Sequence, residues 1–227
     1  MLVGRLWGVS IHIDPSFLLL AVLLVQADLM SGSTERLFVG VLFVLGIAVS
    51  ILLHELGHAA AGARYGSPAV RIDLNGLGGL CTYANGFPAE PGKRIVMALA
   101  GPVANLVIWM ACAAAFRPVM ALDVGSPGAI GWHEVGLAVR RLGEANFVLL
   151  IFNLMPAWPL DGAHALSAAF ERFLPGERAR LVVGWLGLAV AVLCALMAVE
   201  LGPFTLLVAA LLAATNRFVL TGSWPAR

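Results

Sequence analysis

Six long hydrophobic runs, separated by shorter polar segments, organise this chain. A helix needs roughly 20 residues, at a rise of about 1.5 Å each, to cross the hydrocarbon layer of a membrane. The runs have about this length, although the first and the sixth are shorter or interrupted by polar residues. The pattern predicts an all-α membrane protein with about six transmembrane helices, at residues 15–31, 37–61, 95–115, 145–169, 181–199 and 203–220.

Composition supports a membrane protein. The chain has 227 residues, of which 60% are hydrophobic and 12% charged, whereas soluble domains carry about 25% charged residues. A net charge of +1 gives no broad attraction to nucleic acid, so we expect no nucleic-acid partner. The longest polar interval, 62–94, is too short for a separate domain. We expect one integral-membrane domain over 1–227, with a retained first span instead of a cleaved signal peptide.

The distribution of basic residues predicts the orientation. With six spans, the two termini and the 62–94 and 170–180 loops share one side of the membrane, which holds ten of the Lys and Arg residues against four on the other. Basic loops favour the cytoplasm. Both termini should therefore be cytoplasmic, in a bacterial or archaeal cell membrane.

An ionisable motif lies near the end of the second run. The sequence HELGH, residues 54–58, places two histidines four positions apart, so both face the same way on a helix. Such a pair can hold one Zn²⁺, and the intervening Glu55 can take a proton from an activated water. His54 follows Leu37 by 17 residues, or roughly 26 Å of helix, which puts the motif inside the membrane near its cytoplasmic face.

A third ligand must reach the same depth from another span. Asp161 lies 16 residues into the fourth run, level with His54, and is the favoured ligand; His164 is its rival. Pro156 and Pro159 should break the helix just before Asp161. Irregular backbone at this depth is tolerated where it lines a wet pocket. The two remaining histidines, His12 and His133, are expected to be ordinary interfacial residues.

Three segments in order resemble the site-2 proteases, the intramembrane zinc metalloproteases. They are HELGH at 54–58, ALAGPVAN at 98–105 and NLMPAWPLDG at 153–162, and the resemblance covers roughly residues 45–170. It implies that His54, His58 and Asp161 hold one zinc ion per chain and that Glu55 is the catalytic base. It also implies that Asn153 positions the substrate or the developing oxyanion. The chain resembles a minimal member without PDZ or CBS domains, with a catalytic core at about 37–170. It departs from the family at Gly162-Ala163, where Gly-Gly is frequent.

The segment between the second and third spans, residues 66–86, resembles the family's Gly-rich hairpin. Residues 70–74 alternate apolar and polar positions, as a strand does. We expect either an edge strand that pairs with extended substrate or a plain hairpin that closes the pocket. In the third span, Gly101 and Pro102 are expected to serve helix packing, and Asn105 either bridges helices or packs.

The motifs together favour an intramembrane zinc endopeptidase that cleaves single-span membrane-protein substrates in the lipid bilayer. The alternative is a metal transporter that uses the same His54, His58 and Asp161 cluster, although one cluster near one face offers no path across. A di-iron oxidase would need many more than the five histidines present. A catalytically silent chaperone is not indicated, because every expected site residue is present. Substrate identity and oligomeric state cannot be read from the chain.

Overall fold

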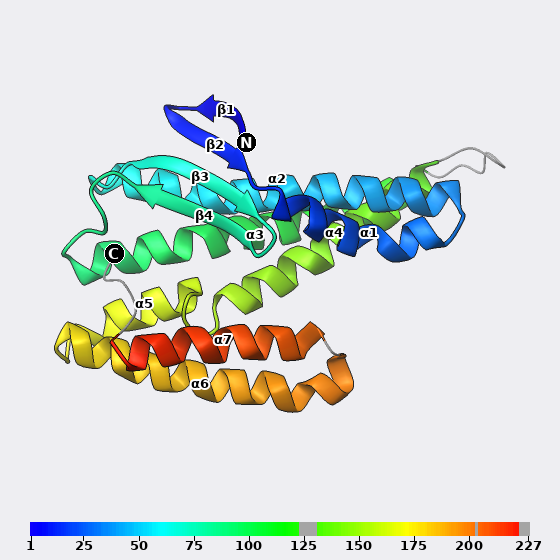
Figure 1. Ribbon diagram of the computed structural model, residues 1–227. Coiled ribbons are helices and arrows are strands. Elements are labelled where there is room, and N and C mark those ends of the chain that lie inside the picture. The colour runs from blue at the N-terminus through cyan, green and yellow to red at the C-terminus, as the bar shows by residue number, and fades with distance from the viewer. Residues whose placement is uncertain (123–130, 203, 223–227) are drawn as a thin grey trace.

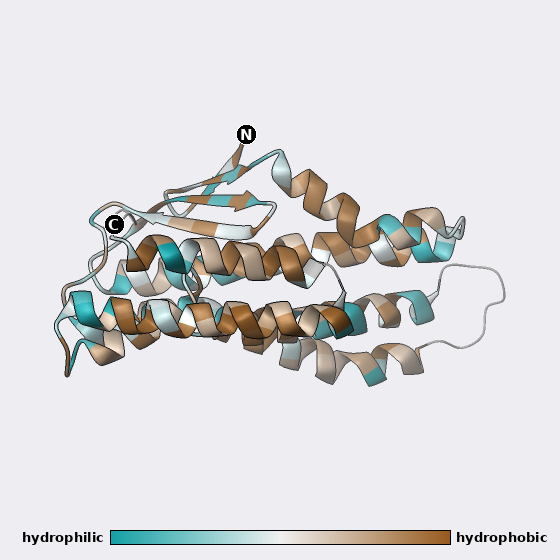
Figure 2. Ribbon diagram, turned by 60° about the horizontal axis from the view of Figure 1, so that its bottom comes forward, coloured by the Kyte–Doolittle hydropathy of each residue, from teal (hydrophilic) through white to brown (hydrophobic). Residues whose placement is uncertain are grey.

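Helices make up most of the protein (Figure 1). The computed structural model describes residues 1–122, 131–202 and 204–222. Hydrophobic residues dominate the middle turns of the long helices, and hydrophilic residues gather towards the helix ends (Figure 2). The helices in chain order are α1 Ser16–Met30, α2 Thr34–Arg64, α3 Pro91–Ala121, α4 Trp132–Asn153, α5 Asp161–Phe170, α6 Gly176–Leu201 and α7 Phe204–Leu220.

Three helices among the described residues are long and apolar enough to cross a membrane: α2, α3 and α6. Two more, α1 and α7, are apolar but have 15 and 17 residues. The count of six spans therefore stays a prediction.

The fourth hydrophobic run does not form one helix. α4 begins at Trp132, well before that run, and ends at Asn153; the chain then passes through an irregular loop, 154–160, and enters α5 at Asp161. This break is the one that Pro156 and Pro159 predict, because proline lacks the amide proton that a helix needs.

α4 also contains Arg140 and Arg141, two of the four basic residues counted on the side opposite the termini. Arg141 lies within α4, where its Nη1 is 2.9 Å from Asp28 Oδ2 on α1. Its guanidinium carbon stands 4.8 Å from the centre of the Phe43 ring on α2. These contacts join α1, α2 and α4. Arg141 therefore serves helix packing, and it is weaker evidence for the orientation predicted from the basic residues.

The fold is mostly helical, as expected, but it carries a four-stranded sheet where the sequence predicted a single hairpin. The strand order is β1-β2-β3-β4; β2 and β3 are parallel, and the outer pairs are antiparallel. The N-terminal residues supply the unexpected pair, whose turn holds Trp7 and Gly8 at φ 49° and 86°, as a type I′ hairpin turn requires. The strands are β1 Leu2–Leu6, β2 Val9–Ile13, β3 Ala69–Asn75 and β4 Gly78–Tyr83.

The sheet corrects the predicted edge strand. Residues 70–74 belong to β3, which pairs with β2 on one side and β4 on the other. Ile72 is fully buried there. Among the described strands, β1 and β4 each have an unpaired side, and β4 is the one of these two that lies against α2 (Figure 1).

The buried face of α2 organises the core. Side chains spaced three or four residues apart point inward along this helix, as an amphipathic helix predicts. The same face that packs the hydrophobic core therefore carries the histidines of the motif into the interior. Its buried members include Phe43, Ile47, Ser50, Ile51, His54, Glu55 and His58.

Candidate metal centre

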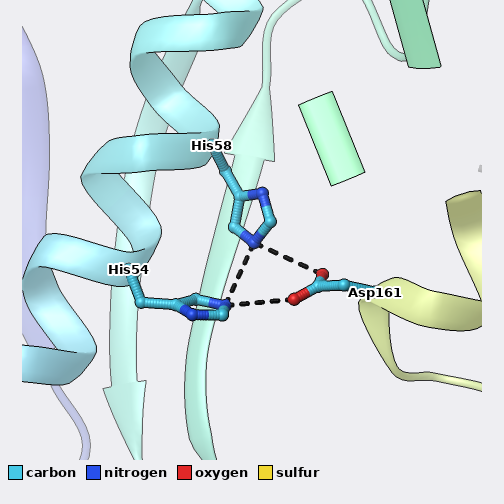
Figure 3. A group of neighbouring side chains, drawn as sticks. All are labelled: His54, His58 and Asp161. Atoms are coloured by element: carbon cyan, nitrogen blue, oxygen red, sulfur yellow. Dashed lines mark hydrogen bonds and ion pairs between the residues drawn. The ribbon is translucent and has the colours of Figure 1, made fainter. Parts of the chain in front are cut away.

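Two histidines of α2 and an aspartate of α5 meet in the interior (Figure 3). His54 Nε2 and His58 Nε2 are 3.1 Å apart. Asp161 reaches them with one oxygen each, Oδ2 at 3.2 Å from His54 Nε2 and Oδ1 at 3.3 Å from His58 Nε2. Each histidine is 7% exposed. The structure thus brings together the three residues that depth along the sequence had grouped.

A hydrogen-bonded chain fixes the protonation of the His54 ring. Asn146 Nδ2 lies 2.9 Å from the carbonyl oxygen of Leu142, which can only accept, so this nitrogen assignment is determined. Asn146 Oδ1 must then accept from Asn105 Nδ2, at 2.9 Å. Asn105 Oδ1 is left to accept from His54 Nδ1, at 2.6 Å. The proton of the neutral ring is therefore on Nδ1, and Nε2 keeps its lone pair.

His58 is oriented in the same sense by the backbone. Its Nδ1 lies 2.7 Å from the carbonyl oxygen of Met97 on α3, so Nδ1 donates. Both Nε2 lone pairs are thus directed at each other and at the Asp161 carboxylate. Hydrogen bonds of this kind hold metal-binding histidines in the tautomer that ligates.

The donor set fits a divalent metal ion. Two unprotonated imidazole nitrogens and a carboxylate converge, and among the described residues Asp161 Oδ2 is buried without a hydrogen-bond partner. A cluster of lone pairs at this separation needs a positive charge between its members. Two nitrogens and one oxygen match the ligand set of a catalytic zinc site, which leaves one position for water or substrate.

Gly101 on α3 makes room for the cluster. A Cβ at this position would collide with His58 Nε2 and stand 2.6 Å from His54 Nε2. On the facing helix α2, a Cβ at Gly57 would lie 2.6 Å from the carbonyl oxygen of Ala100. The two glycines allow α2 and α3 to approach closely. Gly101 thus has a function beyond the helix packing that the sequence predicted, since it keeps the space before both Nε2 atoms open.

Glu55, next to His54 on α2, lies against Gly79 of the sheet. Its side chain is 5% exposed, and a Cβ at Gly79 on β4 would lie 2.6 Å from its Cδ. The absence of a side chain at Gly79 therefore accommodates the carboxyl group. Burial raises the pKa of the neighbouring Cys81 thiol to about 12, so Cys81 is a neutral thiol at physiological pH.

Asp161 owes its position to the loop that precedes it. It is the first residue of α5, after Leu160 in extended conformation. A Cβ at Gly162 would stand 2.6 Å from the carbonyl oxygen of Met155, so glycine lets the loop fold back on the start of α5. Asn153, the candidate oxyanion donor, is the last residue of α4 and is partly exposed.

The remaining histidines lie apart from the described cluster. His164, the rival ligand, packs between Phe87 and Trp158, with ring centres 5.8 Å and 4.7 Å away. His12 is in β2, and His133 is exposed in the first turn of α4. The aromatic contacts assign His164 to the packing of α5.

Sequence analysis missed two residues of the hydrogen-bonded chain, Asn146 and Ser50. Asn146 Nδ2 also donates to Ser50 Oγ, at 3.0 Å, and Asn146 and Ser50 are 0% and 1% exposed. Ser50 lies one turn before His54 on α2, and Asn146 interrupts the apolar end of α4. Isolated polar residues in apolar helices are the signal that could have identified them. Of the two expectations for Asn105, bridging between helices is confirmed.

Comparisons with known proteins agree with this arrangement. Residues 42–122 match the model of peptidase family M50. The chain is 30% identical to a zinc metalloprotease of Methanocaldococcus jannaschii over 168 residues, which are 74% of this chain and 44% of that protein. It is 28% identical to the stage IV sporulation protein FB of Bacillus subtilis over 170 residues, covering 75% of this chain and 51% of that protein. The chain thus spans about half the length of the curated relatives it matches.

A solved structure shares the fold. The site-2 protease from Methanocaldococcus jannaschii superposes with a TM-score of 0.65 at 20% identity, covering 97% of this chain and 94% of that one. The matched segment contains both histidines and Glu55, and the superposition extends over the helix that carries Asp161. The family match over residues 42–122, the similar metalloproteases and the shared fold together make this chain similar to peptidase family M50 in sequence and to a site-2 protease in fold.

Proposed function

We propose that this protein is a zinc-dependent endopeptidase that hydrolyses peptide bonds in or near the transmembrane segments of single-span membrane proteins. One observation carries the proposal. Two Nε2 lone pairs, each set by a hydrogen bond on the far side of its ring, converge with the Asp161 carboxylate beside the buried Glu55. His54, His58 and Asp161 would hold one zinc ion per chain.

The roles of the surrounding residues follow from their chemistry. When bound, zinc supplies a Lewis acid that polarises a carbonyl and lowers the pKa of a water molecule. Glu55 accepts the proton of the attacking water and returns it to the leaving amine. Asn153 donates a hydrogen bond to the developing oxyanion, a contribution of about 10²–10³ in kcat for comparable donors.

The free edge of β4 is the proposed binding surface for the substrate backbone. A peptide bond inside a helix is shielded by the neighbouring turns, so the substrate must become extended before it is cut. β4 has an open side among the described strands, and its Gly79 lies directly against Glu55. A substrate strand added to this edge passes close to the catalytic base, and main-chain hydrogen bonds hold it.

The site is proposed to lie within the membrane near the cytoplasmic face, in an integral protein with both termini in the cytoplasm. Its support is that α2 and α3, which carry the histidines and their partners, are long and apolar enough to cross a bilayer. The transporter alternative is not favoured, because the similar proteins are named as metalloproteases.

Cleavage by reconstituted protein tests the proposal. The purified chain is placed in bilayers with a model single-span substrate, with zinc or with a chelator, alongside Glu55→Gln. The matched control is Glu35→Gln, the same change at the other end of α2, where Glu35 bonds to Ser33. Cleavage should need zinc, survive Glu35→Gln and fall about 10²- to 10⁴-fold in Glu55→Gln. Undiminished cleavage by Glu55→Gln would refute the assigned mechanism.

A proline pair tests substrate addition to β4. Neighbouring amides on a strand point to opposite sides, so of Leu80 and Cys81 one amide faces β3 and the other faces the open edge. Proline at the edge-facing position should leave folding and zinc binding intact and lower turnover. If both proline variants fold and both cleave substrate at the wild-type rate, substrate does not add to this strand.

A further inference from the structure

The loop 154–160, which presents Asp161 to the histidines, packs two buried side chains, Ala157 and Trp158, against the last two helices. Ala157 is fully buried and packs with Ala191 of α6 and Leu212 of α7. Trp158 is 6% exposed and packs with Val183 of α6 and Val219 of α7. α6 and α7 therefore form the support on which this loop rests (Figure 1).

Asn216 of α7 grips the backbone of the loop. Its Oδ1 accepts from the Trp158 amide at 3.2 Å, and its Nδ2 donates to the Trp158 carbonyl oxygen at 3.1 Å. The same Nδ2 donates to Leu212 of its own helix at 2.7 Å, and the side chain is fully buried. One side chain thus satisfies both polar groups of a residue three positions before Asp161. A buried amide in an apolar helix is rarely kept without such a function.

α6 is shaped to admit Asn216. A Cβ at Gly187 would overlap the Asn216 amide, with its Nδ2 only 2.6 Å away. The contact tolerates no side chain at position 187 while the amide stays on the loop. Gly187 on α6 and Asn216 on α7 are therefore both needed for the hydrogen bonds to the Trp158 backbone.

The loop transmits the position of Trp158 to Asp161. Leu160 donates its amide to the Ala157 carbonyl at 2.9 Å, and Ala163 donates to Leu160 at 3.0 Å. Gly162 is packed against the carbonyl oxygens at the start of the loop. These contacts make the loop and the first turn of α5 a compact unit, so a shift at Trp158 displaces the carboxylate.

We infer that Asn216 is a positioning residue of the metal centre: through the backbone of Trp158 it sets the location of the Asp161 carboxylate relative to the two histidines. This inference rests on the proposed zinc-binding function. It extends the metal site to α7, which lies outside both the segment matched by the family model and the catalytic core expected at 37–170. Asn216 touches no metal or substrate and acts only by holding the loop.

Zinc affinity is the measurement that tests this inference. Zinc binding to the purified, metal-free full chain is determined by competition with a chromophoric chelator, for wild type, Asn216→Leu, Asn216→Ala and Gly187→Ala. Thr215→Val is the matched control, because Thr215 is also buried and donates within its own helix to Leu211, at 2.9 Å. Thermal unfolding of each metal-free protein separates loss of fold from loss of positioning.

The expected result is zinc binding about 10- to 100-fold weaker in the Asn216 variants and in Gly187→Ala, with Thr215→Val close to wild type. The metal-free Asn216 variants should still unfold cooperatively, at melting temperatures lowered because the Trp158 backbone groups lose their partner. Hydrogen exchange of the 154–160 amides should be faster in the weakened variants. Folded variants that bind zinc as tightly as wild type overturn the inference alone. If Asn216→Leu does not fold, Asn216→Ala and Gly187→Ala decide by the same criterion. Wild-type protein that binds no zinc overturns the proposed function, and this inference with it.

Discussion

Removing the amide of Asn105 should weaken metal binding without touching a ligand. In Asn105→Ala, His54 Nδ1 loses the acceptor that lies 2.6 Å away in the interior. The ring is then free to move its proton to Nε2, where it blocks the lone pair that faces Asp161 and His58. The variant therefore tests whether the tautomer assigned from the hydrogen-bonded chain is the one that binds metal.

The magnitude follows from the two bonds that disappear. Loss of the hydrogen-bond partner behind a metal-binding histidine costs about 10- to 100-fold in metal affinity, or about 1.4 to 2.8 kcal/mol at 1.4 kcal/mol per factor of ten. The substitution also leaves Asn146 Oδ1 without the donor that stood 2.9 Å away. An unsatisfied buried acceptor costs about 1 to 3 kcal/mol of folding free energy, so the metal-free protein should also melt at a lower temperature.

A second substitution separates these two effects. Asn105→Asp keeps an oxygen opposite His54 Nδ1 but turns an acceptor instead of a donor towards Asn146 Oδ1. It should lose stability and keep its zinc affinity. Cys112→Ala, a buried change on the same helix, is the control for packing loss.

The assay is chelator competition for zinc, beside thermal unfolding of the metal-free proteins. Asn105→Ala should lose zinc affinity, Asn105→Asp should retain it, and both variants should be less stable than wild type. Folded Asn105→Ala with wild-type zinc affinity would show that the hydrogen bond to Asn105 does not prepare His54 for metal.

Three further outcomes follow from the site. Gly101→Ala should bind zinc more than about tenfold more weakly, as measured by metal analysis, because its Cβ would collide with His58 Nε2; normal zinc content would place the ion elsewhere. Gly79→Ala should keep its zinc but cleave model substrate more slowly, because its Cβ would push against Glu55; full turnover would separate Glu55 from catalysis. Chelation of the wild-type protein should lower its melting temperature, since a ligand that binds the native state stabilises it; an unchanged value would argue against a native-state metal.

The sequence predicts the cluster because its determinants are local and periodic. Helical spacing places His54 and His58 on one face. A count along two apolar runs selects Asp161 as the third ligand, although the chain from 145 to 161 is not one continuous helix. The break before Asp161 is likewise a local property of Pro156 and Pro159. These are the features that the structure reproduces.

Other features depend on contacts between distant segments. β2 pairs with β3 across some sixty intervening residues, and no local signal in residues 70–74 could show that both sides of this strand would be covered. The free edge next to Glu55 therefore belongs to β4 and not to residues 70–74. The partners of Asn146 and Asn216 are likewise set by helix packing, so the sequence marks them only as polar residues in apolar surroundings.

X-ray absorption at the zinc edge tests the central claim most directly, namely that His54, His58 and Asp161 bind one zinc ion. Wild-type protein should show nitrogen and oxygen neighbours at about 2.0–2.2 Å, and Asp161→Cys should add a sulfur neighbour at about 2.3 Å. Zinc bound to Asp161→Cys with no sulfur neighbour, or a wild-type protein that binds no zinc, would contradict the account.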